Sequence, residues 1–203
     1  PGLLYRKYRA MRELGVSNVM QCWYFGSAPG IMNKAAGELA FEEFNDDEAA
    51  FLERLARPDW GDDAPAMARL WRAYSDGYEN YPLSNHVQYY GPFHQATVWP
   101  LRPDIELRPL GDSWVAMQPP GGDLIGECLK DFTLGEVLSL TRKMCSGTVV
   151  TNAAGGDALS ALEGKYAGNR NRSRDLGLIR ALKDQWESAG NVFEFYYARR
   201  EAV

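Results

Sequence analysis

The sequence predicts a mainly α-helical protein with one helix–strand unit at its N-terminus and a few short strands. Several segments repeat apolar residues at the spacing of a helix face, and helix-capping residues precede some of them. Only one segment near the start has the composition of a buried strand. With 203 residues the chain is long enough for two parts. We expect the helix–strand unit over residues 1–36 and a helical domain over residues 37–203.

The N-terminal unit joins an amphipathic helix to an apolar strand. Residues 3–14 predict the helix, and Gly15 ends it as a glycine just past a helix does. The apolar face of this helix consists of Leu4, Tyr8, Met11 and Leu14. Residues 17–25 then have the apolar and aromatic composition of a buried strand. Because a parallel strand needs neighbours on both sides and no second such unit follows, we expect the last repeat of a longer α/β domain.

Two helices are predicted in the next part of the chain. The first begins at Asn45, with Glu48 as its capping-box partner, and ends ahead of Pro58. The second covers residues 64–80 and stops before Pro82, which cannot continue a helix. Its apolar stripe consists of Met67, Leu70, Trp71, Tyr74 and Tyr78.

Residues 82–122 differ in composition from the predicted helices. Repeated prolines and glycines predict irregular chain there, with short strands near residues 105–107 and 114–117. After this segment, Thr133 and Glu136 have the spacing of a capping box. They predict a helix that runs to about Met144.

The C-terminal part predicts two more helices. A short helix starts at Asp157, and a long helix runs from Ser173 to about Arg200. Apolar residues of the long helix alternate steps of three and four, as in a coiled coil: Ile179, Leu182, Trp186, Ala189, Phe193 and Tyr196. Ahead of it, a basic cluster among asparagines predicts a solvated loop, and its members are Arg170, Arg172 and Arg174.

Charge, hydropathy and cysteine usage exclude several classes of protein. The net charge of −5 argues against a nucleic-acid partner, which requires a positive field. No apolar run approaches the roughly 20 residues that span a bilayer, so no membrane partner is expected. Cys22, Cys128 and Cys145 show no paired spacing and predict free thiols in a reducing, cytoplasmic compartment. Secretion or periplasmic export is the alternative if a signal peptide precedes this chain.

No cofactor and no metal ion are expected, and catalytic residues stay unassigned. His86 and His94 have no carboxylate or thiol beside them at the spacing of metal ligands. The glycines of residues 121–126 lack the dinucleotide-binding spacing, and the chain contains no nucleophile elbow. Four carboxylates lie near aromatic residues without forming an evident acid–base pair: Glu79, Asp123, Glu127 and Asp131.

The end of the predicted strand is the first candidate for sugar binding. Trp23 and Tyr24 lie there, and aromatic rings offer the apolar faces on which sugar rings stack. Because side chains alternate along a strand, Trp23 and Phe25 share one face and Tyr24 points to the other. Only part of this set can therefore reach a ligand, and packing of Trp23 and Phe25 in the core is the alternative.

Residues 81–101 are the second candidate, through His86, Tyr90, His94 and Trp99. Prolines make this segment rigid, so it has little entropy to lose on binding. It suits a preformed surface that stacks a sugar, with Trp99 or Tyr90 and one histidine lining a concavity shared with Trp23. It equally suits a structural strap, with buried aromatics and with histidines bonded to backbone carbonyls.

Five stretches together carry a resemblance: residues 20–33, 51–56, 71–82, 90–101 and 191–197. They resemble the C-terminal part of large bacterial glycoside hydrolases, in which a helical domain follows a catalytic (β/α) barrel. The resemblance implies that residues 17–25 form the last strand of a TIM barrel. It also implies that the acid and the nucleophile lie on middle barrel strands, so no catalytic residue is carried over to this chain.

We therefore expect a segment of a carbohydrate-active enzyme, a glycoside-hydrolase segment in the sense of this resemblance. It would contribute the wall of a sugar subsite and not the catalytic residues. The wall would consist of Trp23, Tyr24, His86, Tyr90, His94 and Trp99. The expected partners are a carbohydrate and an upstream catalytic domain of the same protein. The alternative is a non-catalytic helical module that packs against a partner domain or forms a homo-oligomer through the seam of residues 179–196.

Overall fold

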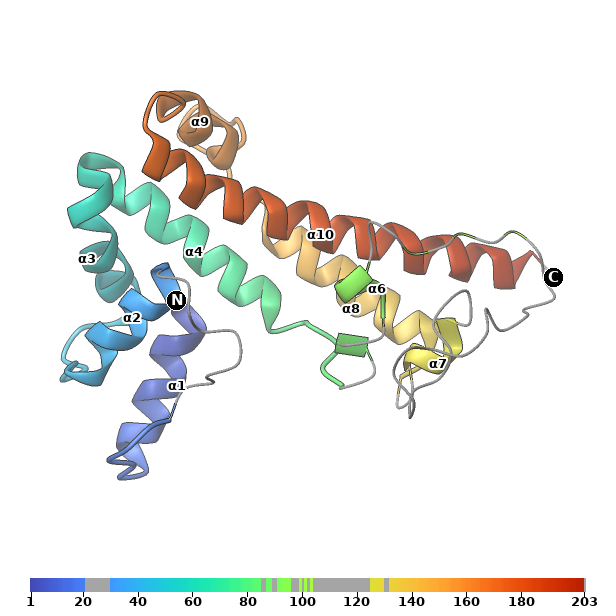
Figure 1. The fold of residues 1–203 in the computed structure, drawn as a ribbon, viewed down its shortest axis with the longest axis horizontal. Coiled ribbons are helices and arrows are strands. Elements are labelled where there is room, and N and C mark those ends of the chain that lie inside the picture. The colour runs from blue at the N-terminus through green and yellow to red at the C-terminus, as the bar shows by residue number, and fades with distance from the viewer. Residues whose placement is uncertain are drawn as a thin grey trace. The chain divides into compact units, whose positions relative to one another are not determined.

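The computed structural model contains helices in every long segment that it describes (Figure 1). It describes residues 1–20, 30–84, 87, 88, 91–95, 99, 101, 103, 125–129 and 132–202. The helices are α1 (Gly2–Glu13), α2 (Ile31–Ala40), α3 (Glu48–Trp60), the short 3₁₀ helix η1 (Gly61–Asp63), α4 (Ala64–Tyr78), α6 (Pro92–Gln95), α7 (Ile125–Leu129), α8 (Leu134–Gly147), α9 (Ala158–Lys165) and α10 (Arg170–Glu201). The predicted mainly helical class is confirmed.

The predicted strands are not shown. Residues 17–20 have no regular secondary structure, and the rest of the strand predicted over 17–25 lies outside the described residues. The strands predicted near 105–107 and 114–117 also lie outside them. Within the described part of the chain, β pairing is limited to an antiparallel bridge between Thr151 and Asp157.

The chain folds into two compact units. Unit 1 consists of Pro1–Asp76 and Val149–Lys165, and unit 2 consists of Gly77–Thr148 and Tyr166–Val203. The boundary predicted at residue 36 falls inside α2, in unit 1. Across the described residues, no helix combines the length and the apolar character needed to cross a bilayer.

Helix α1 packs into unit 1 through a face different from the predicted one. Tyr5 is 2% exposed, and its ring centroid lies 5.4 Å from those of both Phe44 and Phe51. The Tyr5 hydroxyl donates a hydrogen bond of 2.5 Å to the backbone carbonyl of Asp46. Leu14, which was predicted to share the apolar face, is 81% exposed. Aromatic partners some forty residues away in sequence therefore decide which side of α1 is buried.

Helix α3 begins and ends later than predicted. Its N-cap is Asp47, whose carboxylate accepts a hydrogen bond of 2.8 Å from the backbone N–H of Ala50, so Asn45 is not the cap. Glu48 pairs instead with Arg6 of α1, with 2.6 Å between Nε and Oε2. Pro58 lies within the last turn and does not end the helix. At this position a proline removes one hydrogen bond without preventing the final turn.

Helices α4 and α9 follow the predicted pattern, whereas α2 lies where the sequence predicted a loop. Helix α4 buries Met67, Leu70 and Trp71 of the predicted stripe. Helix α9 starts after Asp157, whose carboxylate accepts a hydrogen bond of 2.9 Å from the backbone N–H of Ser160. Both starts agree with the sequence pattern, so local signals suffice for these two helices.

Unit 2 pairs α8 with α10, which lie side by side in Figure 1. The predicted capping box of α8 is confirmed: Glu136 N–H donates to Thr133 Oγ1 at 3.2 Å, and Thr133 N–H donates to Glu136 Oε2 at 2.8 Å. Helix α10 begins at Arg170, because the Asn169 side chain caps it. The prediction that Arg170, Arg172 and Arg174 form a loop is therefore wrong.

The predicted seam of α10 is internal to unit 2. It packs against α8 and α6. Its buried members are Ile179, Trp186, Ala189, Phe193 and Tyr196. Leu182 differs from them, with 44% of its surface exposed. Since these side chains already have partners within unit 2, the seam does not offer a free face for self-association.

Candidate functional site

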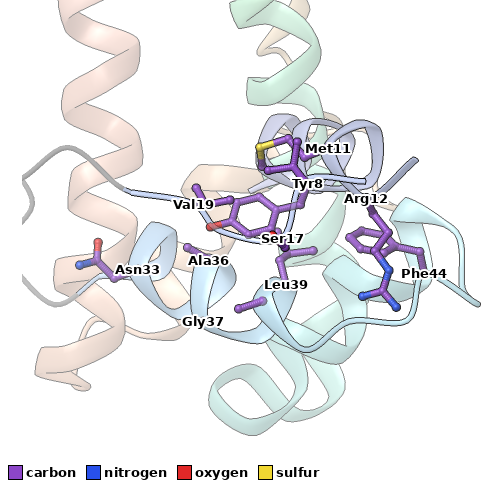
Figure 2. Close-up of a pocket in the computed structure, with 12 residues that line it drawn as sticks. Tyr8, Met11, Arg12, Ser17, Val19, Asn33, Ala36, Gly37, Leu39 and Phe44 are labelled. Carbon is purple, nitrogen blue, oxygen red and sulfur yellow. The ribbon is translucent and has the colours of Figure 1, made fainter. Parts of the chain in front are cut away.

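A cavity of about 670 Å³ lies between α1 and α2 in unit 1 (Figure 2). This volume falls within the range of roughly 300–1,000 Å³ that is typical of small-molecule sites. Its described lining consists of Tyr8, Met11, Arg12, Val16, Ser17, Val19, Asn33, Ala36, Gly37, Leu39, Ala40 and Phe44. The cavity is therefore the candidate functional site.

Helix α1 supplies one wall of the cavity. Tyr8, Met11 and Arg12 are spaced by three and four residues, so they share one face of the helix. Tyr5, three residues before Tyr8, is buried in the core of unit 1. Figure 2 shows the Tyr8 ring across the middle of the cavity.

Helix α2 supplies the opposite wall, and its small side chains create the space. Ala36, Gly37 and Ala40 line the cavity together with Asn33 and Leu39. A Cβ atom built on Gly37 meets no heavy atom within 4 Å. Larger side chains at these positions would occupy the room that a ligand needs.

The segment after α1 closes a third side. Gly15 adopts a positive φ of 73°, which lets the chain turn back sharply after the helix. Val16 N–H then donates a hydrogen bond of 2.9 Å to the carbonyl of Met11. This turn brings Val16, Ser17 and Val19 to the cavity.

Phe44 lines the cavity in a strained backbone conformation. Its φ is +56°, in the left-handed region that bulky residues rarely adopt. The Glu42 carboxylate accepts a hydrogen bond of 3.0 Å from the Phe44 N–H and helps to hold this conformation. The contact between the Phe44 and Tyr5 rings offsets part of a strain that costs about 1–3 kcal/mol. The cavity wall is thus tied to the core of unit 1.

Four polar side chains belong to the described lining of the cavity. They contribute the hydroxyls of Tyr8 and Ser17, the amide of Asn33 and the guanidinium of Arg12. None of the described lining residues is Asp, Glu, His or Cys, so the described lining offers no carboxylate, imidazole or thiol. Elsewhere in the described part, no cluster of three such residues could hold a metal ion.

The structure describes two of the six predicted sugar-binding residues. Trp23, Tyr24, His86 and Tyr90 lie outside the described residues. His94, in the last turn of α6, is exposed, whereas Trp99 is only 6% exposed. Neither side chain is among the described lining of the cavity. The burial of Trp99 favours the structural-strap interpretation for that residue.

The start of the aromatic segment is held within unit 2 by ring contacts. Tyr81 stacks on Tyr78 with 5.0 Å between ring centroids, and Tyr81 lies 4.8 Å from Phe93. Phe93 in turn lies 5.6 Å from Phe193 of α10, and the Gln185 side chain donates a hydrogen bond to the Phe93 carbonyl. Burial raises the pKa of Tyr81. These contacts show that α10 anchors the described part of this segment.

The other titratable candidates give no second site. Glu79 is exposed, and the structure does not describe the side chains of Asp123, Glu127 and Asp131. Cys128 is buried, and burial raises the pKa of the Cys145 thiol. A raised thiol pKa disfavours the reactive thiolate. Cys22 lies outside the described residues.

Most residues of the cavity were not predicted from the sequence to be functional. Tyr8 and Met11 were predicted as part of an apolar core face, and α2 was not predicted as a helix. The run of small residues at Ala35, Ala36, Gly37 and Ala40 is the signal that could have indicated close helix contact or open space. No sequence motif around Arg12 indicates that it lines a cavity.

Comparisons with protein-family models, with curated proteins and with solved structures find no match to this chain. The functional assignment therefore depends on the residues and on the cavity.

Proposed function

We propose that unit 1 binds a small carbohydrate in the cavity between α1 and α2. The observation that carries this proposal is the position of the Tyr8 ring in a cavity of ligand size, with Ser17, Asn33 and Arg12 also in its lining. A sugar ring has apolar C–H faces and a rim of hydroxyl groups. An aromatic ring suits the faces, and an amide, a guanidinium and hydroxyls suit the rim.

In this proposal the chain is a binding segment of a glycoside hydrolase, as the resemblance implies. The described lining contains no carboxylate, so it offers binding groups but not the pair that glycoside hydrolysis requires. The catalytic pair would come from an upstream domain of the same protein. The sugar-subsite wall is then centred on Tyr8, and Trp23 and Tyr24 stay candidates for extending it.

The cavity can be blocked at a position where the protein has open space. A Gly37→Trp variant places an indole in the cavity, and tryptophan also favours the helix more than glycine does. Gly164 of α9 is a matched control, because a Cβ atom there likewise meets nothing within 4 Å. Gly164→Trp adds the same side chain to a helix of unit 1 outside the cavity lining.

The experiment is a titration of the full chain with glucose, N-acetylglucosamine, maltose and cellobiose, followed by ligand-observed NMR. We expect at least one saccharide to bind the wild-type chain and the Gly164→Trp variant, and to lose binding in Gly37→Trp. Absence of saccharide binding by the wild-type chain would contradict the proposal. Binding that survives Gly37→Trp would place the sugar outside this cavity.

A non-catalytic interaction module is the second candidate, and exposed apolar side chains favour it. Leu14, Met20 and Phe41 are each largely exposed in unit 1. Large apolar side chains that gather at a surface are typical of protein contacts. If self-association is the function, sedimentation should show oligomers of the wild-type chain and monomers of a Leu14→Ser, Phe41→Ser double variant.

A further inference from the structure

We infer that the ligand of this cavity carries an acidic group and that Arg12 binds it. This inference rests on the proposed function, because it names the class of sugar that the same cavity selects. It depends on the charge of the cavity lining, on the pairing of the arginines of α1, and on the register of Tyr8 and Arg12.

Arg12 is electrostatically isolated, unlike its neighbours on α1. Arg6 pairs with Glu48 at 2.6 Å between Nε and Oε2, and Arg9 pairs with Glu13 at 3.2 Å between Nε and Oε1. Arg12 has no side-chain hydrogen bond and no carboxylate partner among the residues that the structure describes. Its neighbours three and four residues away, Arg9, Gly15, Tyr8 and Val16, include no acid.

The cavity does not neutralise Arg12 either. Arg12 is the one charged residue in the described lining. Arg12 is exposed to solvent, and its positive charge repels a cationic ligand and attracts an anionic one. An anionic group also forms charge-assisted hydrogen bonds, which are about twice as strong as neutral ones. The electrostatics therefore favour an acidic ligand.

The register of α1 determines where the acidic group lies on the ligand. Tyr8 and Arg12 are four residues apart, so their Cβ atoms are separated by about 5–6 Å along one helix face. A sugar ring on Tyr8 would thus direct an exocyclic substituent toward Arg12. In Figure 2, Tyr8 lies between Asn33 and Arg12, so the two polar side chains flank the aromatic ring.

The chemistry shared by the candidate ligands is one exocyclic anion on a sugar ring. A uronic acid supplies a planar carboxylate, which matches the fork of a guanidinium, and a sugar phosphate supplies a tetrahedral group on a longer arm. The short separation between Tyr8 and Arg12 favours the carboxylate. Comparing the affinities for glucuronate and for glucose 6-phosphate distinguishes a carboxylate ligand from a phosphate ligand.

The test is isothermal titration calorimetry of the full chain with glucose, glucuronate and glucose 6-phosphate at low ionic strength, where charge interactions are least screened. We expect an acidic sugar to bind roughly tenfold or more tightly than glucose. Arg12→Gln should lower the affinity for the acidic sugar until it is no tighter than that for glucose. Arg9→Gln is the matched control on the same helix and should keep the preference.

The outcomes separate this inference from the proposed function. If glucose and the acidic sugars bind equally and Gly37→Trp abolishes both, the cavity binds sugars but the acidic selectivity is wrong. If an acidic sugar is preferred and Arg12→Gln keeps that preference, Arg12 is not the anion ligand and the inference fails. If no probe binds the wild-type chain, both the proposed function and the inference are overturned.

Discussion

Gly147 approaches Gly77 so closely that a Cβ atom built on Gly147 would lie 3.0 Å from the Gly77 Cα. In the reverse direction, a Cβ atom on Gly77 would lie 2.8 Å from the carbonyl oxygen of Met144. The end of α4 and the end of α8 therefore meet through backbone atoms in unit 2. Only residues without a side chain permit this approach.

Replacement of Gly77 by alanine should destabilise the protein. The added methyl group meets a backbone carbonyl that cannot move independently of α8, and such overpacking costs about 1–3 kcal/mol. Urea unfolding measures the loss. Gly164→Ala is the control, because the space there is open and alanine favours the helix by up to about 1 kcal/mol. Equal stability of Gly77→Ala and wild type would show that α4 and α8 do not approach as described.

Replacement of Trp99 by alanine should affect stability more than sugar binding. Trp99 is 6% exposed, and truncation of a buried tryptophan costs about 3–5 kcal/mol. Thermal unfolding should report this loss, while the affinity of the folded variant for a saccharide stays unchanged. The opposite result, an unchanged melting temperature with weaker sugar binding, would restore Trp99 as a ligand contact.

The capping box of α8 should make stability depend on acid pH. Hydrogen bonds from the Thr133 N–H and hydroxyl lower the pKa of Glu136 below its ordinary value of 4.5. Because the folded-state pKa is lowered, the stabilisation is present above pH 4.5 and is lost as the pH falls through the folded-state value.

Urea midpoints at pH 6 and at pH 3 check this dependence. Glu136→Gln keeps a hydrogen-bonding side chain without the titrating group, so its midpoint should fall less between the two pH values than that of the wild type. Identical losses in both proteins would mean that Glu136 does not contribute to acid sensitivity.

The chain by itself should not hydrolyse aryl glycosides. The described cavity lining holds no carboxylate, and barrel enzymes assemble their catalytic groups from several strands. A panel of nitrophenyl glycosides measures this directly. Turnover by the 203-residue chain that Glu79→Gln or Glu127→Gln abolishes would assign catalysis to this segment.

Helix boundaries were predictable where a local signal determines them. Gly15 ends α1, and the Thr133–Glu136 capping box starts α8, as the sequence indicates. The predicted start of α3 was wrong, because Asn45 and Asp47 are both residue types that favour the N-cap position. Contacts with α1, including the ion pair of Glu48 with Arg6, are invisible in the local pattern.

The cavity was harder to predict than the helices. Its space comes from small residues on α2, a helix that the sequence did not predict, and Tyr5 rather than Tyr8 is the buried tyrosine of α1. Arg12 has no ion-pair partner among the described residues, whereas Arg6 and Arg9 of the same helix each have one. Such properties depend on which residues meet in space, and a single sequence does not contain that information directly.

The connectivity of the two units has a consequence for synthesis on the ribosome. The chain passes between the units after Asp76, after Thr148 and after Lys165. Unit 1 stays incomplete until α9 has emerged, and by then most of unit 2 has already been translated. We therefore expect unit 1 to complete its structure only after α9 has emerged, rather than domain by domain from the N-terminus. Because each unit consists of two separate segments, neither can be released intact by cutting a single peptide bond.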